Sequence, residues 1–143
     1  MNKQLTFLLS LTFLFLFGCG VEVKKEFYDS GELKSETYWK DGKQEGLKTY
    51  SYESGKKTYE VLWKDGKSKG LVTDWYESGK KKYVVSWKNR ELDGLETGWF
   101  ESGKKKYELP WKNGKQEGIR KEWDEEGKLT FQGNFVNGVE EIK

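Results

Sequence analysis

Histidine is absent from this sequence of 143 residues, and cysteine and proline occur once each. Without histidine, the chain lacks the side chain that serves most often as a general base and as a zinc ligand. A single cysteine cannot form a disulfide within the chain. The remaining catalytic options are Ser or Thr with a Lys base, or a pair of carboxylates. We expect neither a metal nor a cofactor.

The sequence also lacks an apolar run long enough for a membrane helix, which needs about 20 residues. Its uncharged apolar stretch from Leu5 to Phe17 follows Lys3. A positive start, a short apolar core and small residues at the end are typical of a secretory signal peptide. Residues 16–19, Leu-Phe-Gly-Cys, resemble the lipobox of bacterial lipoproteins, which implies that Cys19 is lipidated. An ordinary signal peptide with an incidental cysteine is the alternative.

This reading divides the chain into three parts. We predict a lipoprotein signal peptide at 1–18, a lipidated N-terminus with a short tether at 19–23, and a repeat domain at 24–143. Several acyl chains, which bacterial lipoproteins carry, give stable anchoring. Lipid on Cys19 would also explain an unpaired thiol in an exported protein.

Neither sign of charge dominates, because 26 Lys and Arg residues stand against 24 Asp and Glu residues. Cleavage before Cys19 would remove only Lys3 from this count. A nearly neutral chain has no overall attraction to nucleic acid, so we expect no nucleic-acid partner. Aromatic residues make up 16% of the chain, whereas disordered tails are poor in them. We therefore expect a folded module with a polar exterior.

A repeat of 24 residues organises the rest of the sequence. "YESGKK" at 76–81 has a near copy 24 residues earlier, and "FESGKK" stands 24 residues later. Two series of glycines follow the same period: Gly31, Gly55, Gly79, Gly103 and Gly127, and Gly46, Gly70, Gly94 and Gly118. The seven tryptophans fall into two columns: Trp39, Trp63, Trp87 and Trp111, and Trp75, Trp99 and Trp123. Residues 24–143 thus hold five periods.

Each period is predicted to form a β-hairpin followed by a second tight turn. Over residues 58–63, side chains alternate with the period of two that a strand with one covered face requires. Asp-Gly at 65–66 is a strong hairpin signal, because glycine tolerates the positive φ of the turn. The return strand is expected at about 71–76. Glu-Ser-Gly-Lys at 77–80 then supplies another turn, with Gly79 in the left-handed position.

The predicted fold is all-β: an elongated, twisted antiparallel meander of about ten short strands built from five 24-residue hairpin repeats and preceded by the apolar signal segment. The first strand is expected at 23–28 and the last at about 129–136. Three columns of apolar side chains are expected to form one continuous apolar face and to carry the stability. They are Tyr59, Tyr83, Tyr107 and Phe131; Val61, Val85 and Leu109; and Leu47, Leu71, Leu95 and Ile119.

The segment "YEVLWKDGKSKGLVTDWYESGKK" at 59–81 resembles a MORN repeat, most closely the bacterial variant found in exported, antitoxin-like proteins. The resemblance implies an elongated sheet of hairpins that interacts with membrane lipids or proteins. Three features depart from the pattern: Arg90 occupies a glycine position of a hairpin turn, Pro110 falls inside a strand, and the last unit ends at its turn. Because proline removes a donor from the strand ladder, we expect a bulge or break near Pro110 and the least regular unit there.

The candidate contact residues are aromatic and basic. The return strands place aromatic residues on both faces, so some of them should be exposed and mark a partner site. Ordinary core packing is the alternative for the aromatic residues, and solvation with edge protection is the alternative for the lysines. The candidates for partner binding are Trp75, Trp99, Trp123, Tyr52, Tyr76, Phe100, Lys56, Lys80, Lys81, Lys104 and Lys105.

Catalysis is not expected. Ser54, Ser78 and Ser102 lie near lysines, but they recur in nearly equivalent turns, whereas a nucleophile needs one tuned environment.

Together these features predict a lipid-anchored envelope protein whose sheet binds a protein, lipid headgroups or an anionic glycan. The main alternative is an immunity or antitoxin protein that neutralises a cognate toxin in a one-to-one complex, and a passive spacer is a third. A dedicated partner site should lie where the repeat is irregular, near Arg90, Gly98 and Pro110, whereas a lipid or glycan surface should follow the regular columns. Gly20 replaces the Asp that resembles an inner-membrane retention signal, which favours the outer membrane or cell surface.

Overall fold

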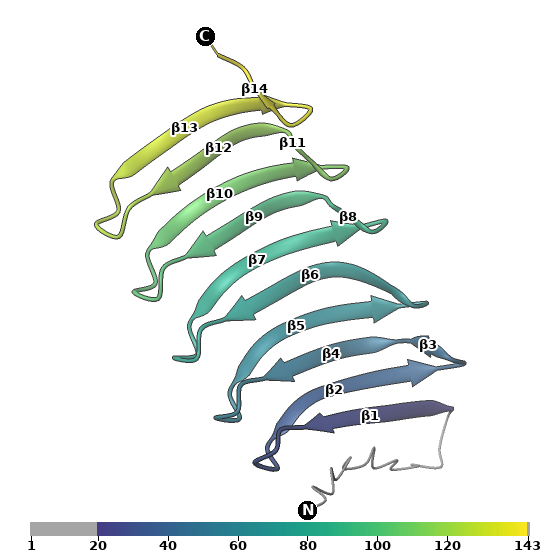
Figure 1. Cartoon of the computed structure of the whole chain (residues 1–143). Coiled ribbons are helices and arrows are strands. Elements are labelled where there is room, and N and C mark those ends of the chain that lie inside the picture. Colours follow the sequence, from purple (N-terminus) through teal and green to yellow (C-terminus); the bar gives the residue numbers. More distant parts are fainter. Residues whose placement is uncertain (1–19, 143) are drawn as a thin grey trace, which may run out of the picture.

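The computed structural model describes residues 20–142, and these form one antiparallel sheet (Figure 1). Strands that follow one another in the sequence also pair in space, so the sheet is a meander. The predicted signal peptide and Cys19 lie outside the described residues. None of the described residues forms a helix with the length and apolar character that a membrane crossing needs.

The sheet has ten longer strands and four strands of two residues. The longer strands are β1 (Val21–Phe27), β2 (Leu33–Lys40), β4 (Gly46–Ser51), β5 (Lys57–Lys64), β6 (Lys67–Trp75), β7 (Lys81–Lys88), β9 (Gly94–Trp99), β10 (Lys105–Lys112), β12 (Gly118–Trp123) and β13 (Leu129–Val136). The short strands, each directly after a hairpin turn, are β3 (Lys43–Gln44), β8 (Glu91–Leu92), β11 (Lys115–Gln116) and β14 (Val139–Glu140). The all-β meander of about ten strands is confirmed.

Two kinds of turn alternate along the sheet, one kind at each side. At one side, both central residues of each hairpin turn have positive φ, as in Asp65 (52°) and Gly66 (72°). This is the conformation of a type I′ turn, which matches the twist of the flanking strands. Arg90 adopts the same conformation with φ 73°, although it has no glycine's freedom there. At the other side, the Gly55 N–H donates to the Tyr52 carbonyl (2.9 Å) in the Glu-Ser-Gly-Lys turn.

The strand ladder is interrupted near Pro110 as expected, but the proline is not the cause of the interruption. The β10–β12 ladder does stop after Glu108 and resumes with β11 at Trp111. The β2–β4 and β7–β9 ladders have the same interruption without a proline. The Pro110 carbonyl accepts the Glu117 N–H (3.0 Å), so its missing N–H faces this interruption and costs no ladder bond. The fourth unit is as regular as its neighbours.

The two faces of the sheet carry different side chains, which corrects the prediction of one apolar face. Pairing of Val61 with Val72 and of Val72 with Val85 places these valines on one face, at 3–5% exposure. We call it the tyrosine face, because Tyr59, Tyr83, Tyr107 and Phe131 share it by alternation along their strands. The opposite face, called the leucine face, carries Leu47, Leu62, Leu71, Leu95 and Ile119.

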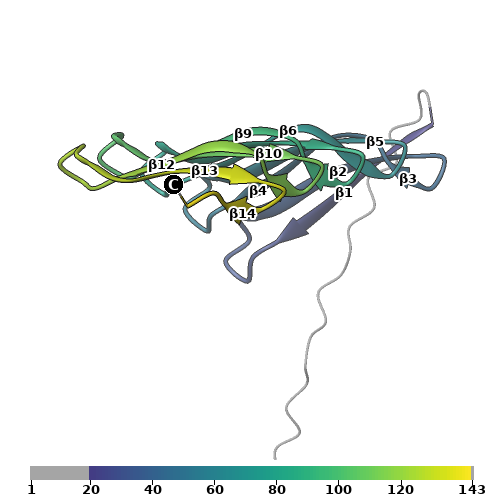
Figure 2. The same ribbon diagram turned by 90° about the horizontal axis from the view of Figure 1, so that it is seen from above.

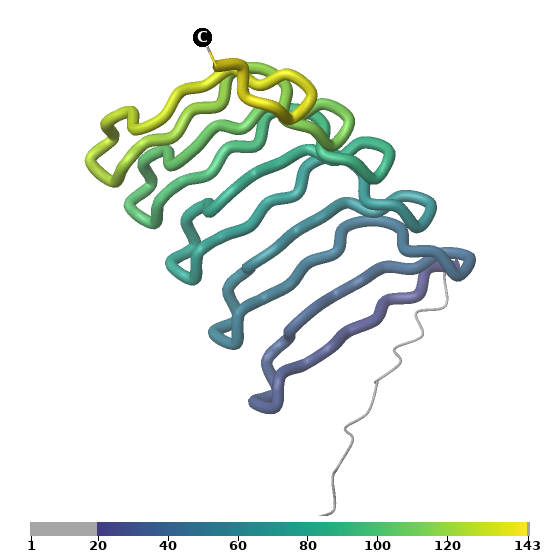
Figure 3. Tube along the Cα trace, turned by 45° about the horizontal axis from the view of Figure 1, so that its top comes forward, coloured from purple at the N-terminus to yellow at the C-terminus, as the bar shows by residue number. Residues whose placement is uncertain are grey.

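Of the three predicted columns, the two that lie on the tyrosine face therefore contribute the buried core, and the leucine column does not. The buried valines are packed against Tyr59, Trp63, Tyr83, Trp87, Leu92 and Trp111. Seen from above, the sheet is a single layer, and no other described element lies over either face (Figure 2). The hairpins are stacked in sequence order and progressively rotated (Figure 3). A sheet this thin cannot bury both of its faces.

Candidate binding surface

The leucine face carries a row of exposed aliphatic side chains that crosses most of the sheet. Leu71 is 63% exposed and Leu95 is 52% exposed, and the other members are more than two fifths exposed. Leu47 is paired directly with Leu62. Members on successive return strands lie two strands apart, about 9.6 Å. Several exposed aliphatic side chains gathered on one face favour an interaction site more than a single exposed leucine does.

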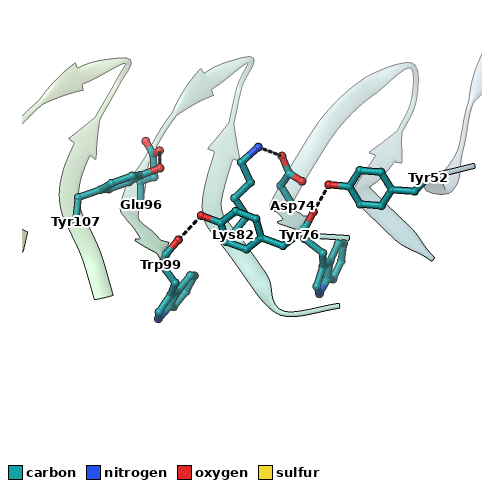
Figure 4. Close-up of polar contacts among 8 residues, drawn as sticks. Tyr52, Asp74, Tyr76, Lys82, Glu96, Trp99 and Tyr107 are labelled. Atoms are coloured by element: carbon teal, nitrogen blue, oxygen red, sulfur yellow. Dashed lines mark hydrogen bonds and ion pairs between the residues drawn. The ribbon is translucent and has the colours of Figure 1, made fainter. Parts of the chain in front are cut away.

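The predicted tryptophans flank this row and are half-buried. Trp75 follows Leu71 and Thr73 on the same strand, and Trp75 pairs with Lys81 at a bulge. The Lys57 Nζ lies 5.1 Å from the centroid of the Trp75 ring, and Lys105 covers Trp123 in the same way at 5.7 Å. In Figure 4, the Trp99 indole points to the opposite side of the sheet from the Glu96 carboxylate. Lysine stems thus cover part of the aromatic surface that the sequence analysis treated as free.

The predicted tyrosine contacts belong instead to a set of bonds between repeats. The Tyr52 hydroxyl donates to the Trp75 carbonyl (2.7 Å), and the Tyr76 hydroxyl donates to the Trp99 carbonyl (2.8 Å; Figure 4). The Tyr28 hydroxyl makes the equivalent bond to the Ser51 carbonyl (2.6 Å). Each bond joins residues 23 positions apart, almost one full period. Phe100, the next residue of this column, has no hydroxyl with which to continue the series.

Several predicted basic contacts are also occupied within the fold. The Lys80 Nζ donates to the Ser102 carbonyl (3.4 Å), and the Lys104 Nζ donates to the Glu126 carbonyl (3.1 Å). These bonds link the Glu-Ser-Gly-Lys turns at 77–80 and 101–104 to the next turn of the same side, which is Glu-Glu-Gly-Lys at 125–128 for Lys104. Lys105 forms an ion pair with Glu108. Lys56 and Lys81 are exposed and form no ion pair within the described residues.

The leucine face is hollowed between β2 and β4, a feature that the sequence analysis missed. The hollow has a volume of about 590 Å³, and its lining includes Leu33, Glu36, Tyr38 and Leu47. The Tyr38 hydroxyl donates to the Glu36 carboxylate, and this bond lowers the pKa of Glu36 against the opposing effect of burial. Lys25, 3.2 Å away, lowers the pKa further. The hollow therefore combines apolar walls with two carboxylates, Glu36 and Glu45.

The tyrosine face contains a close polar cluster around Glu96. The Tyr107 hydroxyl and the Trp111 Nε1 each donate to the Glu96 carboxylate at 2.9 Å. Burial and the Glu96 charge raise the pKa of Tyr107. Gly98 makes this arrangement possible, because a Cβ at position 98 would lie 2.4 Å from the Tyr107 ring. The irregular position Gly98 therefore has a packing explanation.

Asp74 is another carboxylate of the tyrosine face and is less well satisfied than Glu96. It is paired with Tyr59 on one side and Tyr83 on the other. Its Oδ1 atom is buried and accepts no hydrogen bond from residues 20–142. The Lys82 Nζ lies 3.8 Å from its other oxygen (Figure 4). Burial raises the pKa of Asp74, and the Lys82 charge opposes the shift.

The described residues contain no group of three or more Cys, Asp or Glu side chains arranged to hold a metal ion. The neighbouring carboxylates of the tyrosine face are engaged by tyrosine, tryptophan and lysine. The arrangement offers surfaces for binding, and the repeated serines lie in exposed turns.

A comparison with known protein families finds a repeat in this chain. A model described as the MORN repeat variant matches residues 23–41, 69–89, 92–113 and 116–137, which together are more than half of the chain. The chain belongs to the MORN repeat variant family. Residues 42–68, which no match covers, form a hairpin of the same kind through β3, β4 and β5. A comparison with curated proteins finds no significant match.

Proposed function

We propose that this MORN repeat variant protein is a lipid-anchored protein of the bacterial cell envelope whose leucine face binds another protein. The observation that carries the proposal is the row of exposed aliphatic side chains on a face that no described element covers. The rim of this row is polar: Lys57 and Lys105 lie over tryptophans, and Glu60 and Glu108 accompany them. An apolar centre with a polar, aromatic rim is the usual composition of a protein interface.

The row also has the right energetic scale for a binding site. Burying a whole leucine side chain is worth about 1.5–3 kcal/mol, so burying the exposed half of one is worth roughly 1 kcal/mol. Five such side chains provide on the order of 5 kcal/mol before the costs of association. Half-buried tryptophans beside the row would add to this, because aromatic residues are enriched among interface hot spots.

Anchoring is the second part of the proposal. The lipobox-like residues 16–19 support lipid attachment at Cys19, with the outer membrane or cell surface as the favoured location. Fractionation of cells that express the native chain or a Cys19→Ser variant tests it. The native chain is expected in the membrane fraction, and the variant is expected to be released. Equal membrane association of both chains would overturn the anchoring.

Crosslinking in intact cells, followed by purification of the chain, tests the binding face. The test variant changes Leu71 and Leu95 to Ser, and a matched control changes Leu129 and Val139, which are exposed but lie outside the row. We expect one protein to be captured with the native chain and the control, and affinity to fall roughly tenfold or more in the test variant. Equal capture by all three chains would exclude the leucine face.

The stoichiometry of the captured complex distinguishes a scaffold protein from an immunity protein. A one-to-one complex that protects cells from the captured protein would favour the immunity role over a scaffold role. A non-catalytic role is part of the same proposal, and it is supported by the recurrence of Ser54, Ser78 and Ser102 in equivalent exposed turns.

A further inference from the structure

At three of the four junctions between consecutive hairpin turns, the two turns are joined by two hydrogen bonds. Between the first turn (40–43) and the second (64–67), the Asp65 N–H donates to the Glu45 carboxylate (2.8 Å) and the Gly66 N–H donates to the Gln44 carbonyl (3.0 Å). The third turn (88–91), the fourth (112–115) and the fifth (136–139) are joined in the same way. There, Asn113 donates to Asp93 (3.4 Å), Gly114 to Leu92 (2.9 Å), Asn137 to Glu117 (2.8 Å) and Gly138 to Gln116 (2.9 Å).

The second and third turns lack both of these bonds. Lys69 occupies the position that Glu45, Asp93 or Glu117 has in the other units, and an ammonium group cannot accept a hydrogen bond. Arg90 replaces the glycine of the turn and keeps its positive φ of 73°. Within the described residues, the N–H groups of Asn89 and Arg90 donate to no partner across this junction. The two irregularities therefore coincide at one junction.

A hollow of about 450 Å³ lies at this junction and is lined mainly by basic and polar residues. Four lysines line it, Lys64, Lys67, Lys69 and Lys88, together with Asn89 and a single acidic residue, Asp65. None of these lysines forms an ion pair in the part of the chain that the structure describes. The volume exceeds the roughly 30 Å³ share of one water molecule more than tenfold.

We propose that this hollow is a binding site for a phosphoryl group carried on a larger molecule. In the other junctions, a carboxylate oxygen accepts the N–H of the turn residue, so the equivalent N–H of Asn89 is oriented for an oxyanion. Successive backbone N–H groups in a turn form anion-binding concavities. A phosphoryl dianion would supply the missing acceptor oxygen and would also neutralise the surrounding lysines, which a carboxylate does less completely. Asp65 opposes binding, and four lysines outweigh it.

Nuclear magnetic resonance of the full-length chain in non-ionic detergent tests the site. Glycerol 3-phosphate is titrated at constant ionic strength, with glycerol as the uncharged reference. We expect saturable shifts of the Asn89 and Arg90 amide signals and little change at Asn113 and Gly114, whose N–H groups are already bonded. Shifts of equal size at both junctions, or shifts that do not saturate, would mean general charge screening and would overturn the proposal.

Two variants restore the regular repeat and should close the site without harming the fold. Lys69→Glu supplies the missing acceptor and should lower affinity roughly tenfold or more, the equivalent of one charged hydrogen bond. Arg90→Gly should lower it less, because it removes one cation and relaxes the turn. Lys40→Glu makes the same charge change on the first turn and should alter affinity less than about twofold. Unchanged affinity in Lys69→Glu with an intact circular dichroism spectrum would refute the site.

The carrier of the phosphoryl group is identified by a second titration. Vesicles of phosphatidylcholine with and without phosphatidic acid are sedimented with the native chain, the Lys69→Glu variant and the Lys40→Glu control. Binding that needs phosphatidic acid and is lost only in Lys69→Glu assigns a lipid headgroup. Binding of glycerol 3-phosphate without vesicle binding assigns a soluble phosphate ester. Either result supports the site, whereas binding of neither probe excludes it.

Discussion

Equivalent positions of the repeat are occupied by Tyr28, Tyr52, Tyr76 and Phe100. Substitution can therefore remove a hydrogen bond at one of these positions and add one at another. Tyr76→Phe deletes the bond from the hydroxyl to the Trp99 carbonyl (2.8 Å). A neutral hydrogen bond of this kind contributes about 1 kcal/mol to the free energy of unfolding. For a domain of this size, that corresponds to a fall of about 3–5 °C in Tm. Phe100→Tyr should raise Tm by a similar amount, because a hydroxyl there would reach the Trp123 carbonyl.

Thermal unfolding and urea titration, both followed by circular dichroism, measure the two changes. Tyr50→Phe is the control, because the Tyr50 hydroxyl makes no hydrogen bond to any residue that the structure describes, and its ring keeps the edge contact with Tyr59 (5.8 Å between centroids). The control should stay within about 0.5 kcal/mol of the native chain. If Tyr76→Phe costs no more than the control and Phe100→Tyr gains nothing, these bonds do not hold the repeats together.

Three further predictions concern the packing of the tyrosine face. Gly98→Ala should destabilise the fold by about 1–3 kcal/mol in urea titration, because the new Cβ would overlap the Tyr107 ring; a smaller loss would mean that the ring moves freely. Val72→Ala should cost about 1.5–3 kcal/mol, whereas Leu71→Ala, on the other face, should cost less than 1 kcal/mol; equal losses would contradict the assignment of the faces. Asp74→Asn should stabilise the fold at neutral pH, since burial raises the pKa of Asp74 and so disfavours its charged form. Protonation restores this stability as pH falls from the raised pKa towards 3.8, so the advantage of Asp74→Asn should shrink there; an advantage independent of pH would rule out this cause.

The sequence by itself determined the periodic part of this fold. Asp-Gly and Asn-Gly pairs specify turns whose two central residues need positive φ, and the distance of 24 residues between them sets the length of each hairpin. The alternation over 58–63 predicted a strand that the structure extends to β5 at Lys57–Lys64. These features are local, because backbone sterics and neighbouring side chains decide them without help from the rest of the chain.

Contacts between repeats needed the tertiary structure. A period of two says which residues share a face, but it does not say which face the paired strands bury. Leu71 was therefore predicted among the stabilising columns, whereas the structure buries its neighbour Val72. The roles of Tyr52, Tyr76 and Lys104 depend on carbonyl groups about one period away in the sequence. Such carbonyls carry no signature of their own in the sequence.

The irregular positions of the repeat could be recognised in the sequence, but their structural roles could not. Arg90 was visible as a departure from the repeat, and Gly98 and Pro110 were visible with it. Only the structure showed that Gly98 accommodates the Tyr107 ring and that Pro110 faces an interruption common to several units. It also brought Lys69 beside the turn of Arg90, because hairpin stacking places residues about 20 positions apart in contact. The repeat is visible in the sequence because local backbone sterics require particular residues at each turn. Strand pairing, in contrast, determines which irregular residues lie next to each other in the folded protein.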